Sequence, residues 1–208
     1  GAIAAGMGRL GLRAKPKSMS RKQACAAIGQ VRLMHMYDKF FGEYGKTTAQ
    51  ILITRDDMED RMRLKHAKNT FAALLKDKAI PIVNENDAIT TEEIKIGDND
   101  TLSAHVCKLV EGDLLILLSD IDGLYDCNPT CNKDAKLINY VKTVNEEVVS
   151  SAEGAGSSLG TGGMITKLNA ARIVNSTGAA MVIVNGSAPD ILSRVISGEN
   201  IGTFFDCE

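Results

Sequence analysis

Residues 113–119, which read DLLILLS, constrain the fold of this chain more than any other stretch. The run is apolar without the alternation of polar and apolar residues that marks a strand with one face in water. Parallel strands that are joined through helices have both faces covered and give such runs. The stretch therefore predicts a strand of a parallel sheet with helices on both sides.

The segments around this strand alternate between helical and strand patterns. Apolar spacing predicts helices over 21–44, 60–78, 101–110, 164–177 and 190–197, and strands over 50–54, 79–84, 113–119 and 179–185. Residues 1–6 (GAIAAG) have the pattern of a glycine-led helix start, and residues 85–93 that of a hairpin or extended loop. Without a domain break or repeat, the pattern predicts one α/β domain over residues 1–208: a three-layer αβα sandwich with a mostly parallel central sheet.

Composition and charge exclude several classes of protein. Hydrophobic residues make up 44% and charged residues 24% of the 208, an ordinary globular balance. The net charge of −2, without a basic run, gives no support for a nucleic-acid or membrane partner. The sequence contains neither a run of about eighteen apolar residues nor a signal-peptide pattern. Five scattered cysteines favour reduced thiols, and we expect a cytoplasmic protein.

Metal-ligating residues are sparse in the sequence. Cys127 and Cys131 form the only close pair of cysteines, and no second pair or suitably spaced histidine completes a zinc site. His35, His66 and His105 lie far apart in helical patterns, where surface or half-buried positions are expected. The sequence therefore predicts no protein-built metal site.

Polar loops follow several of the expected strands. Ligands of open parallel sheets bind at the carboxyl ends of the strands, which directs attention to residues 84–87, 97–100, 119–123 and 160–167. The amides and carboxylates of 84–87 suit a zwitterionic ligand, although turn residues are also often Asn and Asp. Ser119 and Asp120 end the buried strand, where Asp120 could cap a turn or bind a nucleotide hydroxyl or a metal-bound water. These two alternatives stay open.

The glycines of 160–167 precede a helix, as in loops whose backbone N–H groups bind a phosphate. Lys167 follows on that helix and can reach a phosphate as a point charge. The loop is not a Walker A sequence, and glycines alone also suit a surface loop. The lysine favours phosphate binding.

Residues 96–106 (IGDNDTLSAHV) place two carboxylates and an amide directly before a helical pattern. A helix cap needs one such side chain, and we expect Asp100 or Thr101 to supply it. Asp98 and Asn99 are then left for other chemistry.

Four motifs in this order, PIVNEND (81–87), EIKIGDND (93–100), LLSDIDGLY (117–125) and GTGGMITK (160–167), closely resemble the glutamate kinases of the amino acid kinase family. Residues 1–6 and 54–57 (TRDD) fit the same family, so the resemblance spans essentially the whole chain. It implies the αβα amino acid kinase fold and ATP- and Mg²⁺-dependent phosphorylation of the γ-carboxylate of L-glutamate, the first step of proline biosynthesis. It also implies a homo-oligomer, inhibited by proline competing with glutamate within 57–93.

The resemblance also implies roles for individual residues. Asp87 and Asn99 would bind glutamate, beside the backbone of Gly1 and Ala2. Asp100 would orient the catalytic lysines, Asp98 would organise the substrate and metal region, and Lys95 is a further electrostatic contributor. Lys167 would also stabilise the transferring phosphoryl group. ATP would be bound by Ser119, Asp120, Thr161, Gly162, Gly163, Met164, Ile165, Thr166 and Lys167.

The chain departs from this family pattern at its start. The family's first strand–helix–strand segment, with a Gly-x-Lys phosphate loop and one catalytic lysine, has no counterpart before Gly1, and the small PUA domain of some members has none at the other end. We therefore expect an N-terminally incomplete kinase domain that is inactive or nearly so, and poorly stable, on its own. Two alternatives stay open: a non-catalytic glutamate or proline sensor, and a kinase of the same fold for another small acceptor such as aspartate, N-acetylglutamate, carbamate or uridylate.

Overall fold

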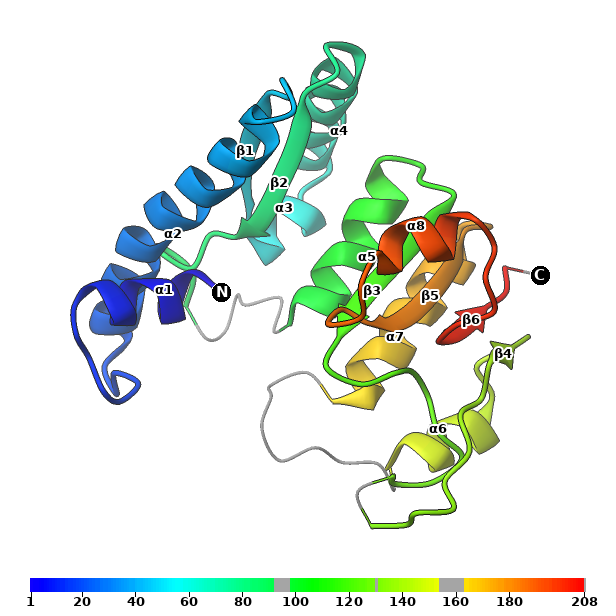
Figure 1. The fold of residues 1–208 in the computed structure, drawn as a ribbon. Helices are drawn as coiled ribbons and strands as arrows, with labels where there is room; N and C mark the ends of the chain where they lie inside the picture. The colour runs from blue at the N-terminus through cyan, green and yellow to red at the C-terminus, as the bar shows by residue number, and fades with distance from the viewer. Residues whose placement is uncertain (92–97, 130, 154–162, 208) are drawn as a thin grey trace. The chain divides into compact units, whose positions relative to one another are not determined.

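The computed structural model describes residues 1–91, 98–129, 131–153 and 163–207, with side chains described outside 151–153 (Figure 1). The chain divides into two compact units, residues 1–96 and 97–208, called here the N-terminal and C-terminal units. Each unit is an α/β arrangement, as the alternating pattern predicts. Within the described ranges, no helix is both long and apolar enough to cross a bilayer.

The described part of the N-terminal unit contains two parallel strands and four helices. β1 pairs with β2 so that Ile51 lies opposite Val83, and α2 contacts β1 while α4 contacts β2. Pro81 is the second residue of β2, as expected for a proline that starts a strand. The elements are α1 (Ala2–Arg9), α2 (Met19–Gly42), β1 (Thr48–Ile53), α3 (Arg55–Glu59), α4 (Arg61–Lys76) and β2 (Ile80–Glu85).

The helix predicted over 60–78 is preceded by a short helix that the apolar pattern does not reveal. Thr54 and Asp57 form a capping box at the start of α3: the Asp57 N–H donates to Thr54 Oγ1 at 3.3 Å, and the Thr54 N–H donates to Asp57 Oδ2 at 2.8 Å. Asp60 separates the two helices, because its Oδ1 accepts from the Met62 and Arg63 N–H groups and so caps α4. Capping side chains, rather than apolar spacing, set these boundaries.

Helix α1, predicted from the glycine-led start of the chain, packs directly on α2. Two glycines permit the close approach. A Cβ atom on Gly6 would lie 1.8 Å from the Cys25 carbonyl oxygen, and one on Gly29 would lie 1.7 Å from the Ala2 carbonyl oxygen. The two backbones are therefore in contact, and Ala2 is buried at 3% exposure.

The C-terminal unit contains a four-stranded sheet in the order β3-β5-β6-β4. β3 pairs parallel with β5, β4 pairs parallel with β6, and only β5 and β6 are antiparallel, so the mostly parallel prediction is confirmed. The elements are α5 (Asn99–Leu109), β3 (Leu114–Ser119), β4 (Tyr140–Val141), α6 (Glu146–Glu153), α7 (Met164–Asn175), β5 (Ala180–Asn185), α8 (Ile191–Ile196) and β6 (Thr203–Phe205).

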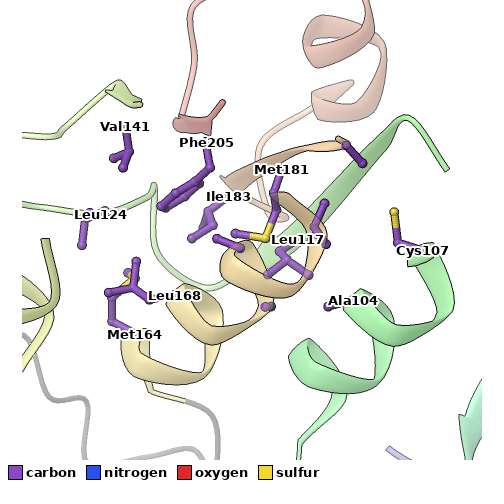
Figure 2. Packing of buried hydrophobic residues seen from close by; sticks show 14 residues of the cluster. Ala104, Cys107, Leu117, Leu124, Val141, Met164, Leu168, Met181, Ile183 and Phe205 are labelled. Atoms are coloured by element: carbon purple, nitrogen blue, oxygen red, sulfur yellow. The ribbon is translucent and has the colours of Figure 1, made fainter. Parts of the chain in front are cut away.

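The two faces of β5 carry two separate apolar clusters. Met181 and Ile183 belong to the main core with residues of α5 and α7, among them Leu168 (Figure 2). Val182 and Val184 point the other way and pack with Ile191 of α8. Alternating side chains on one strand thus bury against helices on both faces, which makes three layers.

Apolar side chains of β3 pack into both clusters, Leu117 into the main core and Ile116 into the cluster of Ile191 on the other face, so the prediction of a strand covered on both faces is confirmed. In the described sheet of this unit β3 is an edge strand, and Leu118 is 53% exposed, whereas Met181 to Val184 of β5 are all buried. An apolar run identifies a strand of a parallel sheet, but it does not distinguish an edge strand from its neighbour.

We predict that Gly29→Ala destabilises the N-terminal unit by about 1–3 kcal/mol, because the added methyl group must push α1 and α2 apart. Thermal unfolding monitored by circular dichroism measures the loss. Gly42→Ala is the matched control, since Gly42 also lies in α2 but a Cβ atom there meets nothing within 4 Å. Equal melting temperatures for the two variants would contradict the close contact.

Candidate active site

Helix α5 begins at Asp98, which is its N-cap. Asp98 Oδ1 accepts a hydrogen bond from the Thr101 N–H at 2.7 Å, and Asp98 Oδ2 accepts one from Thr101 Oγ1 at 2.9 Å. The expectation that Asp100 or Thr101 caps the helix is therefore wrong. The cap residue must have an extended backbone, as Asp98 has, whereas Asp100 and Thr101 already lie inside the first helical turn.

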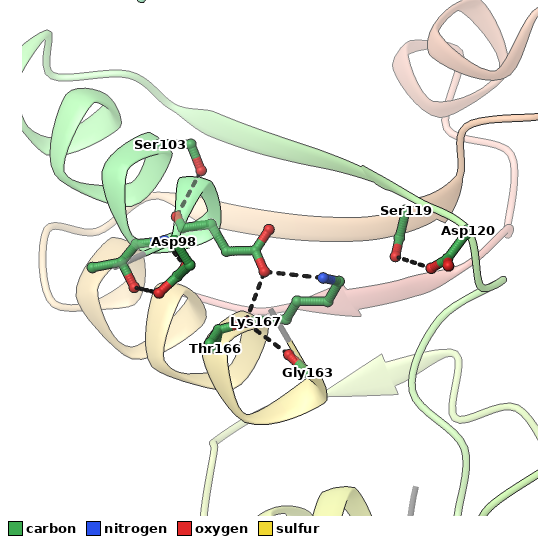
Figure 3. A network of polar contacts seen from close by, with 9 residues as sticks. Asp98, Ser103, Ser119, Asp120, Gly163, Thr166 and Lys167 are labelled. Atoms are coloured by element: carbon green, nitrogen blue, oxygen red, sulfur yellow. Dashed lines mark hydrogen bonds and ion pairs between the residues drawn. The ribbon is translucent and has the colours of Figure 1, made fainter. Parts of the chain in front are cut away.

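Release of Asp100 from the capping role leaves its carboxylate for another contact. Asp100 Oδ2 accepts hydrogen bonds from Lys167 Nζ at 2.9 Å and from Thr166 Oγ1 at 2.8 Å. Thr166 Oγ1 also bonds the Gly163 carbonyl oxygen at 2.7 Å. These bonds join the first turn of α5 to the first turn of α7, and Figure 3 shows Thr166, Lys167 and Gly163 gathered at the start of α7.

The ion pair is largely withdrawn from water. The side chain of Lys167 is 10% exposed and that of Asp100 is 19% exposed. A buried ammonium group is costly unless it is paired, and the hydrogen bond to Asp100 offsets that cost and holds the amine in one position. The pair thereby presents a fixed positive group at the start of a helix.

Helix α7 starts directly after a glycine. Its N-cap is Gly163, no side-chain hydrogen bond caps it within the described residues, and a Cβ atom there would meet nothing within 4 Å. Backbone N–H groups in the first turn of a helix need an acceptor and carry the positive end of its dipole. Together with Lys167 they form an arrangement suited to an anion such as a phosphate.

The loop after β3 is tied to the end of β5 by residues that the sequence analysis did not single out. Asn185 Nδ2 donates to Asp122 Oδ1 at 2.9 Å, and Tyr125 Oη donates to Asp122 Oδ2 at 3.0 Å. Burial, and then the hydrogen bond to Asp122, raises the pKa of Tyr125 and keeps it a donor. Ser119 Oγ donates to Asp120 Oδ1 at 3.3 Å in the same loop. Asn185 was identifiable, since it ends its strand as Ser119 ends β3.

In the N-terminal unit a cavity of about 200 Å³ lies beside the end of β2. Asp87 and Ala2, two of the predicted substrate contacts, line it together with Gln30, Gln50 and Glu85. Gly1, the N-cap of α1, precedes Ala2 but is exposed and outside the lining. The polar wall consists of amides and carboxylates, which can bind both the ammonium and the carboxylate of an amino acid.

The remaining predicted site residues are distributed as follows. Asn99 is the exposed first residue of α5. Met164 is buried in the main core, so it can face a ligand only through its backbone, and Ile165 is 38% exposed. Thr161, Gly162 and Lys95 lie outside the described residues. The structure thus brings Asp100, Thr166 and Lys167 into contact in one unit and Ala2 and Asp87 to one cavity in the other.

The histidine and cysteine of α5 have pKa values that differ from their ordinary values. Burial, and secondarily the charge of Lys108, lowers the pKa of His105 on α5. Burial, and secondarily Asp113, raises the pKa of the Cys107 thiol, which disfavours its reactive thiolate. All five cysteines are free, and the part of the chain that the structure describes has no cluster of three potential metal ligands.

Comparison with known proteins identifies the class. The sequence matches the amino acid kinase family over residues 1–185, and the chain belongs to this family. Solved structures agree on the fold: isopentenyl phosphate kinase from T. acidophilum has a TM-score of 0.64 at 17% identity, covering 96% of this chain and 77% of its own. UMP kinase from Bacillus anthracis has a TM-score of 0.60 at 14% identity, covering 97% and 73%.

Within the family, the chain is similar to glutamate 5-kinases. It is 57% identical to that of Clostridium tetani and 58% identical to that of Clostridium acetobutylicum, in each case over 99% of this chain and 77% of the relative. The enzyme from Caldanaerobacter subterraneus is 54% identical over 99% of this chain, which spans 55% of that longer relative.

We predict that Asp98→Ala lowers the free energy of unfolding by about 1 kcal/mol, since two bonds to Thr101 are lost at the start of α5. Chemical denaturation measures this loss. Asp98→Asn keeps an acceptor for the Thr101 N–H and serves as the conservative control. If both variants unfold like the parent protein, Asp98 does not stabilise the helix.

Proposed function

We propose that this protein transfers the γ-phosphoryl group of ATP to the γ-carboxylate of L-glutamate, which yields γ-glutamyl phosphate and ADP and begins proline biosynthesis. The observation that carries the proposal is the buried Lys167 amine, held by Asp100 at 2.9 Å in the first turn of α7, whose N-cap is Gly163. Similarity to glutamate 5-kinases at 57% and 58% identity supports the choice of acceptor.

Phosphoryl transfer to a carboxylate requires positive charge and correctly positioned substrates, and it requires no general acid or general base. In the transfer, a carboxylate oxygen of glutamate forms a bond to the γ-phosphorus while the bond to the β–γ bridging oxygen of ATP breaks. The nucleophile is already an anion, so no proton needs to be removed. Carboxylate and phosphate repel each other, and a preorganised ammonium group such as Lys167 stabilises the charge on the transferring group.

In this proposal each unit binds one of the two substrates. The N–H groups at the start of α7, with Thr166 and Lys167, bind ATP phosphates, and Ser119 and Asp120 contact the nucleotide. Ala2 and Asp87, on the cavity of the N-terminal unit, bind the amino-acid end of glutamate. Asp100 acts on Lys167, and Asp98 sets the position of α5.

Mg²⁺ fits this site as an ion that arrives with the nucleotide. Magnesium usually keeps several waters and binds one or two protein carboxylates together with substrate phosphates, so a cage of protein ligands is not required. Asp98 and Asp100 are the acidic side chains at the start of α5 that could meet such a complex. The ion would supply positive charge to the phosphate oxygens. We further propose a cytoplasmic homo-oligomer.

Substitution of the ion pair separates turnover from substrate binding. We predict that Lys167→Met lowers kcat by about 10²- to 10³-fold in the complete natural protein, because a charge on the transferring group is lost. Asp100→Ala lowers kcat as well, since the amine loses its position, whereas Asn99→Ala mainly raises the glutamate KM. Coupled ADP-release kinetics measure all three.

Lys108→Met is the matched control, because Lys108 is an exposed lysine of the same unit. Full turnover in Lys167→Met would refute the catalytic role of this lysine. Binding of glutamate by the parent protein without any release of ADP in the presence of ATP would indicate a sensor and refute the kinase proposal.

Proline inhibition is a further part of the proposal. If proline competes with glutamate within residues 57–93, it raises the apparent KM for glutamate and leaves kcat unchanged. Initial rates over a range of glutamate concentrations, with and without millimolar proline, measure this effect. Glycine serves as the control amino acid, and identical kinetics with proline and glycine would rule out the inhibition.

A further inference from the structure

Two glutamines of α2 contact the segment that carries Asp87. Gln23 and Gln30 are separated by seven positions, which places them on the same face of the helix. Gln30 contacts Asn84 near the end of β2, and Gln23 contacts Thr90 six residues further along the chain. Asp87 lies midway between these two points.

The contact at Gln30 is part of a directed and mostly buried chain of amides. The Glu85 N–H donates to Asn84 Oδ1 at 3.0 Å, and Asn84 Nδ2 donates to Gln30 Oε1 at 3.0 Å. Gln30 Nε2 in turn donates to Gln50 Oε1 at 3.1 Å. Gln30 and Asn84 are each 8% exposed, so these bonds compete little with water.

The contact at Gln23 holds the other end of the segment. Gln23 Nε2 donates to the Thr90 carbonyl oxygen at 3.3 Å. Thr90 is 4% exposed, and its hydroxyl and N–H groups both donate to the Asn86 carbonyl oxygen, at 2.6 and 3.1 Å. The segment between the two glutamine contacts is thus a compact turn whose own bonds fix its shape, while α2 fixes its place.

We infer that Gln23 and Gln30 form a clamp that holds the Asp87 turn against α2 and so sets the affinity of the cavity for its amino-acid substrate. Both are positioning residues, and Gln30 also lines the cavity. The inference rests on the proposed function, because it assigns the turn to glutamate binding. A turn that is placed before the substrate arrives need not be ordered on binding, which improves affinity without a new contact.

The test replaces each glutamine by methionine, which keeps the length of the side chain and removes its hydrogen bonds. We expect Gln30→Met and Gln23→Met each to raise the glutamate KM by about tenfold in the complete natural protein, while kcat and the ATP KM stay within about twofold. Because both glutamines hold one turn, we expect the double variant to lose less than the product of the two single losses.

A second readout does not depend on activity. The amide protons of Asn86, Asp87, Ile89 and Thr90 each have a backbone acceptor in the structure, so their hydrogen exchange reports whether the turn is held. We expect faster exchange at these positions in both variants. Thr48→Val is the matched control: it removes another side-chain bond between α2 and the sheet, from Thr48 Oγ1 to Asp38 Oδ1 at 3.2 Å, away from the turn.

The outcomes are distinct. Unchanged exchange in both variants, or an unchanged glutamate KM in an active protein, overturns the inference, as does an equal effect of Thr48→Val. If Gln30→Met does not fold, Gln23→Met decides, because its side chain is only half-buried. A parent protein that does not phosphorylate glutamate refutes the proposed function instead, and the exchange data then decide whether the clamp itself exists.

Discussion

The ion pair between Asp100 and Lys167 is the interaction on which the organisation of the C-terminal unit depends. Both groups lie at helix starts, in α5 and α7, and both side chains are mostly withdrawn from water. Breaking such a pair by removing one partner typically costs about 3–5 kcal/mol, because the other charge is left buried and alone. Because the ion pair is costly to break, it fixes the two helix starts relative to each other. The ion pair also keeps the Lys167 amine from turning toward solvent, so its positive charge stays at a position where an anion can bind.

Asp98 and Asp100 have different roles, because only Asp98 caps α5. Asp98 uses both carboxylate oxygens on Thr101, which leaves Asp100 available to Lys167 and Thr166. Helix α7 differs from α5, because its N-cap residue is Gly163, which has no side chain that could accept a hydrogen bond. Within the described residues, a side chain caps the start of α5 and no side chain caps the start of α7. This asymmetry is the physical basis for assigning phosphate binding to α7 rather than to α5.

Much of this fold was predictable because its strongest signals are periodic. The helices and strands of the alternating pattern lie within a few residues of their predicted bounds, as β5 at Ala180–Asn185 illustrates. What the pattern missed depends on side-chain capping or on tertiary contacts. Helix α3 depends on Thr54 and Asp57, and no apolar period marks it. The edge position of β3 depends on which strand pairs with it, and that information lies in β5.

The site was predictable to a similar degree. Motif resemblance identified Asp100 and Lys167, which the structure joins, but their hydrogen bond could not be derived from two positions far apart in the sequence. The hydrogen bonds that join the side-chain amides of Gln30, Gln50 and Asn84 could not be predicted from the sequence, for a related reason. Glutamine on a helix has an ordinary propensity and gives no motif, so only the packed structure reveals that it bonds a strand end.

The chemical contrast between the two units follows from the charges of the proposed reaction. ATP phosphates need positive charge, and the C-terminal unit provides it through Lys167 and a helix start. Glutamate carries both signs, so a lysine placed beside its ammonium group would repel it. Amides avoid this conflict, since each offers a donor and an acceptor without a net charge. Gln30 and Asn84 can therefore stay buried beside Asp87 at little electrostatic cost, where a buried lysine would demand its own carboxylate. On this argument, Gln30 and Gln50 line the amino-acid cavity beside the carboxylates of Glu85 and Asp87 because an amide adds no charge that would repel either end of the substrate.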